Sequence, residues 1–394
     1  MTLPTILPGT QPDGQPVMLG VMGGGQLGRM FIHAAQRMGY QTAVLDPDRA
    51  SPAGLVSHQH VQTDYLDEQG LASMARCCAA ITTEFENVPA AAMRSLGAQR
   101  PVSPGADALS IAQDRIREKA HFAACGVACA PYAVVSSAQD LATVEGFLLP
   151  GILKTARLGY DGKGQVRVKS QAELGTAWQT LGQVACVLEQ EQALTAECSV
   201  VLARGRDGAM VHFPVQHNLH RAGILAVTEV FEGNVPGALA LQAVAAARSI
   251  AEGLAYVGVL CVEFFVVQGG RLLVNEIAPR PHNSGHYTLD ACDQSQFELQ
   301  VRTLAGLPLA QPRQHSPAIM LNLLGDLWLA AGGPAVTPDW AAVLALPGTH
   351  LHLYGKLEPR AGRKMGHLTI TGPTMAQVRA VAAQSAALLG LPLP

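Results

Sequence analysis

A glycine-rich turn joins two apolar segments of the chain, VLCVEFFVV and RLLVNEIA. Apolar segments on either side of such a turn predict an antiparallel hairpin. If Gly269 and Gly270 are the two turn residues, Glu263 lies directly across from Glu276, and both side chains project from the same face. Two acids opposed inside an apolar hairpin constrain both the fold and what the hairpin can bind.

The two carboxylates need a positive partner. Two like charges about 5 Å apart repel by roughly 3 kcal/mol at an effective dielectric constant of about 20. A divalent cation resolves this conflict, and the two carboxylates with the amide oxygen of Asn275 suit Mg²⁺ that bridges nucleotide phosphates. The alternatives are one protonated glutamate or a different strand register.

The stretch LGYDGKGQ, residues 158–165, lies between two further strand patterns, GILKTA and QVRVKS. A Walker loop needs a helix directly after its lysine, so this stretch does not fit one. Its glycines are predicted at the tip of a hairpin, where backbone N–H groups and Lys163 can cover a phosphate chain. A plain hairpin turn is the alternative, but Lys154 in the preceding apolar strand calls for a partner.

Residues 17–46 predict a strand, a glycine turn, a helix to about Met38 and a second strand that ends at Asp46. The glycines between residues 23 and 28 satisfy GxGxxG, and Asp46 lies at roughly the distance of a ribose-binding acid. This pattern is typical of dinucleotide-binding folds. The same glycines also serve simply to let a helix pack on a sheet, so both interpretations stay open.

The segment AAITTEFENVP predicts another strand, which ends in Glu84 and Glu86. Open α/β sheets place ligands at this carboxyl edge, although solvated loop acids are the alternative. The next helix is expected from about Ala108 to Cys125. Arg115 and Lys119 are four residues apart on it and share a face, which could also be only a solvated surface.

Two polar patterns occur further along the chain. His217 and His220 in HNLH are three residues apart, a spacing that suggests a metal pair but is more often structural. HLHLYGKLEPRAGRKMGHLTITG predicts two strands joined by a turn with proline and glycine. Four basic residues cluster around this turn, as an anion receptor or as a solvated surface: Lys356, Arg360, Arg363 and Lys364.

Composition limits the partners. The 394 residues are 48% hydrophobic, enough for two or three domains with their own cores. A net charge of -3, with 14% charged and 5% aromatic residues, provides neither a basic surface nor stacking platforms for a nucleic acid. Small molecules are the expected partners.

Cysteines and apolar runs indicate the compartment. The eight cysteines are scattered through a long chain, so reduced core thiols are expected rather than disulfides, with redox or metal chemistry at Cys77-Cys78 or at Cys125 and Cys129 as the alternative. The N-terminus does not read as a signal peptide, and no apolar run is long enough to span a membrane. We therefore expect a cytoplasmic protein.

A glycine flap, a strand lysine and paired carboxylates together describe an ATP and Mg²⁺ site. At this point the chain resembles the ATP-grasp enzymes, specifically the N5-carboxyaminoimidazole ribonucleotide synthetase family of purine biosynthesis. The motifs GGGQLGRM, EFENVP, GYDGKGQ, HNLHRAGIL, NEIAPRPHNSGH and GRKMGHL occur in the family's order from about Val17 to Gly372. Leu158 stands where the family usually has glycine, and Glu191 where a small or apolar residue is commoner.

The resemblance implies a set of nucleotide-binding residues. It assigns Mg²⁺ to Glu263, Asn275 and Glu276, and no biotin carrier is evident. From the residues alone, Glu189 and Glu197 would both be surface acids. The residues that the resemblance assigns to ATP are Arg115, Lys154, Gly159, Tyr160, Asp161, Gly162, Lys163, Gly164, Gln165, Glu189, Gln190, Glu197, His220, Asn275 and Glu276.

The resemblance also implies the reaction. Bicarbonate attacks ATP to give carboxyphosphate, which carboxylates the amine of 5-aminoimidazole ribonucleotide. Arg280, His282 and Asn283 would act at the bicarbonate site, and Tyr160 would close over the second substrate. The residues assigned to the ribonucleotide are Gln26, Glu84, Lys356, Arg363 and Lys364.

The predicted fold is a three-part α/β structure of the ATP-grasp type. It has an N-terminal extension (1–16), an open parallel, Rossmann-like sheet domain (17–115), a small lid with the flap (116–193), and a mixed-sheet region with the carboxylates and the basic turn (194–394). The family implies a homodimer. Three rivals stay open: another ATP-grasp carboxylase or ligase, an NAD-binding dehydrogenase, and a nucleotide sensor without turnover.

Overall fold

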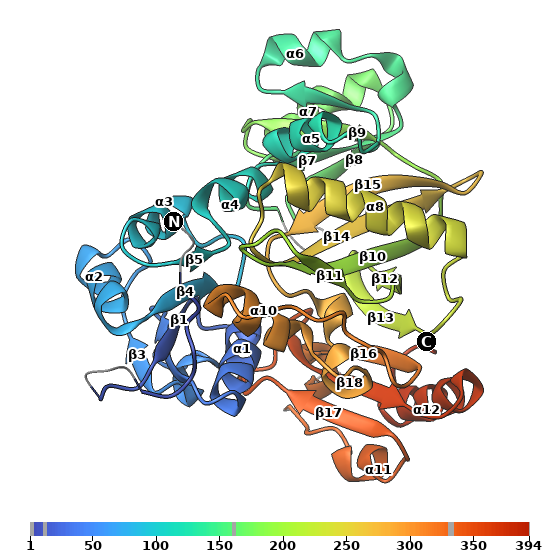
Figure 1. The fold of residues 1–394 in the computed structure, drawn as a ribbon. Coiled ribbons are helices and arrows are strands. Elements are labelled where there is room, and N and C mark those ends of the chain that lie inside the picture. The colour runs from blue at the N-terminus through green and yellow to red at the C-terminus, as the bar shows by residue number, and fades with distance from the viewer. Residues whose placement is uncertain (1–3, 11–13, 160–162, 330–334, 394) are drawn as a thin grey trace.

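The computed structural model describes residues 4–10, 14–159, 163–329 and 335–393. Three sheets, each with its own helices, follow one another along the chain (Figure 1). This order of parts agrees with the predicted α/β architecture. The domain boundaries given above stay a prediction. Among the described residues, no helix is both long enough and apolar enough to cross a membrane.

The first sheet is parallel and has the strand order β3-β2-β1-β4-β5. It begins with the predicted strand, glycine turn, helix and strand. Apolar residues of β1 and α1 pack together in one core with residues of α10 from the third sheet's part of the chain. The elements are β1 Met18–Met22, α1 Gln26–Arg37, β2 Gln41–Leu45, β3 Gln59–Val61, α2 Glu68–Cys77, β4 Ala80–Thr83, α3 Ala90–Gly97 and β5 Val102–Ser103.

The predicted helix over residues 108–125 is two helices, α4 Ala106–Ala112 and α5 Arg115–Ala124. The break occurs because Asp114 leaves the helical conformation and caps α5, where its side chain accepts hydrogen bonds from the N–H groups of Ile116 and Arg117. Aspartate is a favoured N-cap because its carboxylate satisfies N–H groups that have no helical partner. The single long helix was therefore wrong.

The second sheet forms the lid, drawn in green at the top of Figure 1. Its strands run antiparallel in the order β6-β9-β7-β8. Apolar residues of this sheet and of α7 form a separate small core. The elements are β6 Tyr132–Val135, α6 Ala138–Thr143, β7 Gly151–Thr155, β8 Gln165–Val168, α7 Gln171–Thr180 and β9 Cys186–Gln190.

The third sheet has nine strands in the order β15-β14-β10-β12-β13-β16-β18-β17, with β11 paired to β10. Its strand pairs are antiparallel, and the only parallel pairing at its edge, among the described residues, is the bridge between Cys129 and Val274. The strands are β10 Leu194–Arg204, β11 Met210–His212, β12 Gln216–Arg221, β13 Ile224–Val230, β14 Gly258–Val267, β15 Arg271–Ala278, β16 Ala318–Leu324, β17 Thr349–Leu353 and β18 Lys364–Thr371.

Helices cover this long sheet at both ends. α8 packs on β10 and β14, and α12 packs on β16 and β18 (Figure 1). The eight cysteines are all free thiols, as expected. The helices are α8 Gly237–Gly253, α9 Thr288–Ala291, α10 Gln296–Ala305, α11 Trp340–Leu344 and α12 Met375–Leu388.

Candidate active site

The opposed acids of the predicted hairpin lie on β14 and β15. Glu263 pairs with Glu276 across the two strands, as predicted. The turn itself differs, because Val267 pairs with Arg271 and the connection therefore has three residues instead of two. A bulge that leaves Asn275 without a partner then restores the alignment. The opposition is confirmed, and the two-residue turn is corrected.

Each of the two carboxylates has a basic side chain as a partner within the chain. His282 Nε2 lies 2.8 Å from Glu263 Oε1, and Arg115 Nη1 lies 3.1 Å from Glu276 Oε2. Burial alone would raise the pKa of Glu263, but His282 lowers this pKa to about 2. Like-charge repulsion therefore does not by itself require a metal. The oxygens of Glu263, Glu276 and Asn275 nevertheless form a donor set that suits Mg²⁺.

The helix α5 supplies three side chains to this region. Arg115 contacts Glu276, and Glu118 Oε1 accepts a hydrogen bond from the N–H of Ile277 at 2.8 Å. Burial raises the pKa of Glu118 to about 8. Lys119, only 1% exposed, points to Glu189. The interpretation of this helix face as a solvated surface is therefore wrong.

Glu189 is buried between two lysines. Its carboxylate lies 2.8 Å from Lys154 Nζ and 3.0 Å from Lys119 Nζ. Burial raises the pKa of Glu189, but the two ammonium groups outweigh burial and bring the pKa to about 2. Lys154 thus has the partner that its apolar strand required. Glu189 is not a surface acid, contrary to the interpretation from the residues alone.

The predicted flap is the hairpin of β7 and β8. Lys154 pairs with Gln165, and Thr155 N donates to Gly164 O at 2.9 Å. Tyr160, Asp161 and Gly162 lie outside the described residues, and Lys163 and Gly159 border them.

The family's glycine is replaced here by Leu158, which is 75% exposed and has φ of 62°. This left-handed conformation is unfavourable for leucine.

Gln190, predicted to lie with Glu189 in a linker, is instead the last residue of β9. Gln190 Nε2 donates to the carbonyl of Phe147 at 2.8 Å. Glu191, which departs from the family pattern, pairs with Arg167 of β8 at 2.9 Å.

On the adjoining sheet, Glu197 Oε2 lies 3.0 Å from His220 Nδ1. Burial would lower the pKa of His220, but the hydrogen bond to Glu197 and the neighbouring carboxylates raise it. His217 pairs with Cys198 and Glu229 across its strands and joins no described group of three metal-ligating side chains.

The loop after β15 connects the carboxylates to the first sheet. Arg280 Nε lies 2.5 Å from Glu86 Oε2, so Glu86 is not merely a solvated loop acid. Burial would raise the pKa of Glu86, but Arg280 lowers it to about 2. Asn283 is 7% exposed, and neither its amide oxygen nor its amide nitrogen has a hydrogen-bond partner among the described residues. A buried amide with both ends unpaired is costly, which favours a polar ligand at this position.

The glycine turn before α1 is occupied by carboxylates of the chain itself. Glu84 accepts hydrogen bonds from Gly25 N at 2.8 Å and from Gly28 N at 3.1 Å. Asp46 accepts one from Gly24 N at 2.7 Å. A pyrophosphate would need these same N–H groups and would meet two carboxylates. The dinucleotide-binding interpretation of the turn is therefore wrong.

Burial raises the pKa of Glu84, against the lowering effect of these N–H groups. Through its hydrogen bonds to Gly25 N and Gly28 N, Glu84 stabilises the start of α1. Gln26 is the first residue of this helix and is partly exposed.

The basic turn lies between β17 and β18. Lys356 Nζ donates to the carbonyl of Lys364 at 2.6 Å and lies 5.7 Å from the centre of the Tyr354 ring. Arg363 Nη1 donates to the carbonyl of Glu358 at 2.8 Å. The charge of Lys364 also helps to lower the pKa values of Glu86, which follows β4 of the first sheet, and of Glu263 on β14, after the larger effects of burial and their direct partners.

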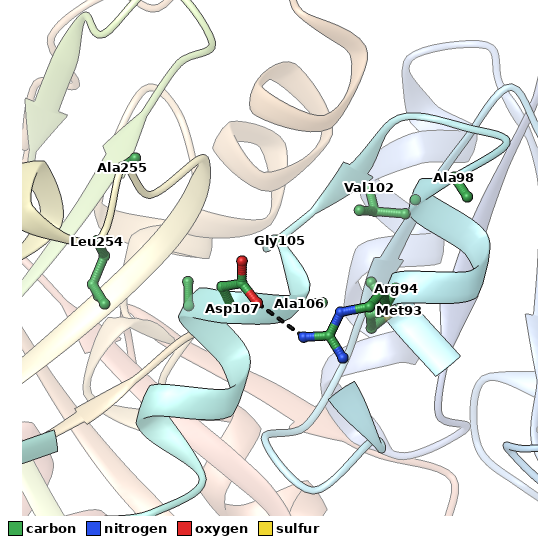
Figure 2. Close-up of a pocket in the computed structure, with 11 residues that line it drawn as sticks. Met93, Arg94, Ala98, Val102, Gly105, Ala106, Asp107, Leu254 and Ala255 are labelled. Atoms are coloured by element: carbon green, nitrogen blue, oxygen red, sulfur yellow. Dashed lines mark hydrogen bonds and ion pairs between the residues drawn. The ribbon is translucent and has the colours of Figure 1, made fainter. Parts of the chain in front are cut away.

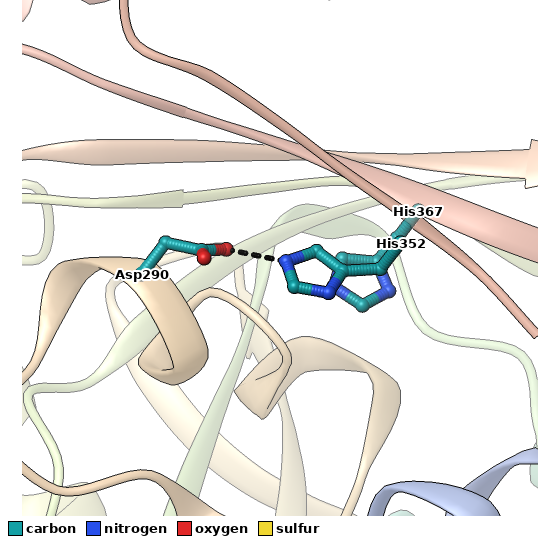
Figure 3. Close-up of side chains that lie close together, drawn as sticks. All are labelled: Asp290, His352 and His367. Atoms are coloured by element: carbon teal, nitrogen blue, oxygen red, sulfur yellow. Dashed lines mark hydrogen bonds and ion pairs between the residues drawn. The ribbon is translucent and has the colours of Figure 1, made fainter.

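Three metal-ligating side chains lie together beside this turn: Asp290, His352 and His367 (Figure 3). His352 Nε2 lies 2.9 Å from Asp290 Oδ2, and His367 Nδ1 bonds to the hydroxyl of Tyr354. The two imidazole rings are stacked, with centres 4.5 Å apart and planes inclined by 11°. Imidazole lone pairs lie in the ring plane, so two nearly parallel rings cannot direct them at one ion. The arrangement is a hydrogen-bonded stack rather than a metal site.

Figure 2 shows a pocket between α3, α4 and the residues that follow α8. It has a volume of about 440 Å³ and is lined by residues of α3 and α4 and by the end of α8. Its polar side chains, Arg94 and Asp107, pair with each other at 2.9 Å. None of the predicted site residues lines it, so the pocket carries no functional assignment.

Known proteins match the chain over most of its length. Three family models cover it in order: a ribonucleotide synthetase preATP-grasp domain at residues 17–113, an ATP-grasp domain at 120–297, and a phosphoribosylaminoimidazole carboxylase C-terminal domain at 318–381. The N5-carboxyaminoimidazole ribonucleotide synthase of Brucella melitensis is 43% identical over 362 residues, which are 90% of this chain and 96% of that protein. The chain belongs to the N5-carboxyaminoimidazole ribonucleotide synthase family.

Other members of the N5-carboxyaminoimidazole ribonucleotide synthase family agree with this assignment. The Bacillus subtilis enzyme is 39% identical over 89% of this chain and 90% of its own. A crystal structure of an ADP complex of such a synthetase superposes with a TM-score of 0.88 at 36% identity and covers 98% of both chains. The Aspergillus clavatus synthase in complex with ADP and 5-aminoimidazole ribonucleotide has a TM-score of 0.85 at 29% identity, over 95% of this chain and 98% of its own.

The sequence did not reveal the partners of several residues of the site. The spacing of Lys119 from Arg115 put both on one helix face, but the contacts of Glu118 and Lys119 depend on the packing of α5 against β15 and β9. Their spacing of three and four residues from Arg115 was the available clue, since such residues share a helix face. The alternation of HLHLY puts His350 and His352 on one face of β17, whereas His367 comes from β18 and meets His352 only because the two strands pair.

Proposed function

We propose that this chain carboxylates 5-aminoimidazole ribonucleotide with bicarbonate at the expense of ATP, and that the product is N5-carboxyaminoimidazole ribonucleotide. One observation carries the proposal: a nucleotide-type site and a cationic turn meet at the loop of Arg280 to Asn283. Arg280 in that loop pairs with Glu86, which follows β4 of the first sheet. The charge of Lys364 in the basic turn helps to lower the pKa of the same carboxylate. Membership of the family supports the same reaction.

Positioning is the chain's main contribution to the first step. A bicarbonate oxygen forms a bond to the γ-phosphorus as the bond to the β–γ bridging oxygen breaks, which gives carboxyphosphate and ADP. Lys154 neutralises charge on the phosphates, and the buried amide of Asn283 offers a donor and an acceptor to bicarbonate. The flap of β7 and β8 excludes water from an intermediate that hydrolyses readily.

In the second step the exocyclic amine of the ribonucleotide forms a bond to the carboxyl carbon. Inorganic phosphate leaves, and the amine loses a proton. Contacts with Glu263 and with Ser284 Oγ, 2.9 Å from Nδ1, fix the orientation of the His282 ring, which supports a role for this ring in the second step. Gln26 on α1 and the cations of the basic turn would hold the ribonucleotide.

The donor set of Glu263, Asn275 and Glu276 would hold Mg²⁺. When bound, the ion neutralises the β- and γ-phosphates of the nucleotide. Arg115 and His282 pair with the two acids of this set, so both side chains would have to share or release their carboxylates when Mg-ATP binds.

The test of function is phosphate release from Mg-ATP. We expect release that requires both bicarbonate and 5-aminoimidazole ribonucleotide, together with an acid-labile carboxylated product. Release that needs bicarbonate alone would keep the ATP chemistry but favour another ATP-grasp ligase. ATP binding with no release under any condition would favour a sensor and contradict the proposal.

Two further expectations come from the family. We propose a homodimer, to be checked by measuring the molar mass of the full chain in solution by light scattering. We also propose a cytoplasmic location, to be checked by fractionation of cells that express the tagged chain.

A further inference from the structure

Arg29, in the first turn of α1, has no carboxylate partner among the described residues. It is partly exposed, and in the described part of the chain its only hydrogen bond runs from Nη1 to the carbonyl of Pro52, at 3.1 Å. The first turn of α1 contains no acidic residue. A positive charge is unfavourable near a helix N-terminus because the helix dipole is positive there. An unpaired arginine in this position therefore favours a negatively charged ligand.

The guanidinium of Arg29 lies against the segment that leads into the basic turn. A Cβ atom added at Gly355 would lie 2.9 Å from Arg29 Nη1 and 3.3 Å from Cζ. Gly355 has φ of 75° and directly precedes Lys356. The absence of a side chain at residue 355 thus lets Arg29 reach the backbone beside the cations of the turn, although the two segments are more than 300 residues apart in sequence.

Three N–H groups of the neighbouring glycine turn are already bonded to carboxylates of the chain. The N–H groups of Gly24, Gly25 and Gly28 are bonded to Asp46 and Glu84. An anion at this end of α1 would therefore be bound through side chains. Arg29 follows Gln26 by three residues, so the two side chains lie on the same side of the helix.

We propose that Arg29 is a further phosphate-binding residue, which joins Lys356, Arg363 and Lys364 around the 5′-phosphate of the ribonucleotide. The inference rests on the proposed function, because it uses the basic turn as the phosphate receptor. Arg29 adds the planar pair of N–H donors that matches two phosphate oxygens, which a lysine cannot reproduce. It also links the helix that carries Gln26 to the turn that binds the phosphate, so that ribonucleotides are favoured over unphosphorylated ribosides.

The test compares Arg29→Met and Arg29→Lys with the wild-type chain in steady-state carboxylation. For Arg29→Met we expect the KM for 5-aminoimidazole ribonucleotide to rise roughly 10- to 100-fold, as for the loss of a charge-assisted hydrogen bond. Arg29→Lys should recover part of the loss. The KM for Mg-ATP and the melting temperature should stay near the wild-type values. Arg37→Met is the matched control, because Arg37 is exposed in the last turn of the same helix.

A second variant changes the other partner of the contact between Arg29 and Gly355. Gly355→Ala places a methyl group against the guanidinium and should raise the same KM without removing any charge.

An unchanged KM for the ribonucleotide in Arg29→Met, with a raised KM in Lys356→Met, would overturn the role of Arg29 and leave the phosphate receptor in place. Unchanged values in both variants would overturn the receptor as well. A change in the KM for Mg-ATP equal to that for the ribonucleotide would indicate a structural role and also contradict the proposal.

Discussion

At the scale of single residues, the site consists of buried charges that the chain itself neutralises. The buried Glu189 has two lysines and the buried Glu263 has His282, while Glu276, whose side chain is 41% exposed, pairs with Arg115. Buried carboxylates are tolerated only when they are paired, because the loss of hydration is otherwise uncompensated. These pairs hold the side chains in place before any ligand binds.

Glu276→Ala should abolish turnover. The change removes one of the two opposed carboxylates and leaves Arg115 without its partner. We expect kcat to fall by at least about 100-fold, as when a charge stabiliser of phosphoryl transfer is lost. The measurement is ribonucleotide-dependent phosphate release. Activity near the wild-type level would contradict the assignment of Glu276 to Mg²⁺.

Lys119→Met should weaken ATP binding through Glu189. With one ammonium group gone, the Glu189 carboxylate pairs with Lys154 alone, and Lys154 is less available to phosphates. We expect the KM for Mg-ATP to rise by roughly tenfold, the equivalent of about 1.4 kcal/mol. Arg117→Met, an exposed change on the same helix, is the control. A raised KM for the ribonucleotide with an unchanged KM for ATP would speak against this role of Lys119.

At the scale of elements, the flap hairpin and α5 carry residues that we propose bind the nucleotide. The hairpin of β7 and β8 was predictable because strand alternation and glycines are local signals. The start of α5 depends on the cap at Asp114, which sets the direction of Arg115, Glu118 and Lys119. The flap has one unfavourable position, Leu158, whose φ is positive.

Leu158→Gly should stabilise the lid. Glycine adopts the left-handed conformation without the Cβ clash, while Leu158→Ala removes the same exposed side chain and keeps the clash. We expect the glycine variant to have a free energy of unfolding about 0.5–1 kcal/mol higher than the alanine variant. Denaturant unfolding of both proteins measures this difference. Equal stabilities would show that the backbone at residue 158 is not strained.

At the scale of the whole molecule, long-range contacts hold the three sheets together. Arg280 of the third sheet's loop pairs with Glu86 of the first, and α10 packs its apolar side chains against α1 and β1. The active site lies where these contacts join the parts of the chain. Its geometry therefore depends on the packing of the parts, and its stability depends on pH through the buried pair.

The Glu86–Arg280 pair should make stability fall in acid. Folding lowers the pKa of Glu86 from 4.5 to about 2, so the folded state releases this proton more readily than the unfolded state. The contribution to stability is full above about pH 4.5 and is lost as the pH falls toward 2. At pH 7 it amounts to at most about 3 kcal/mol.

The comparison is Glu86→Gln against wild type in denaturant unfolding at several pH values. We expect the variant to be less stable at pH 7 and the difference to shrink with acid. Glu145→Gln, an exposed change, is the control. A difference that stays constant from pH 7 to pH 3 would contradict the pKa shift of Glu86.

Local signals in the sequence predicted much of the fold. The strand, glycine turn and helix of the first sheet, the flap hairpin and the β14–β15 hairpin all appeared near their expected residues. The opposition of Glu263 and Glu276 was also predictable, although a longer turn and a bulge at Asn275 together produce it. Periodicity and turn residues act over a few positions, so they can be read without the rest of the chain.

By itself, the sequence determined which segments become strands and helices and, through its motifs, the family to which the chain belongs. Only the tertiary structure decided the partners: Glu189 between its two lysines, the glycine turn filled by Glu84 and Asp46, and Arg29 against Gly355. The physical reason is the separation along the chain over which each kind of interaction acts. Alternation and capping depend on neighbours in the chain, whereas charges pair with whatever packing brings within a few ångströms.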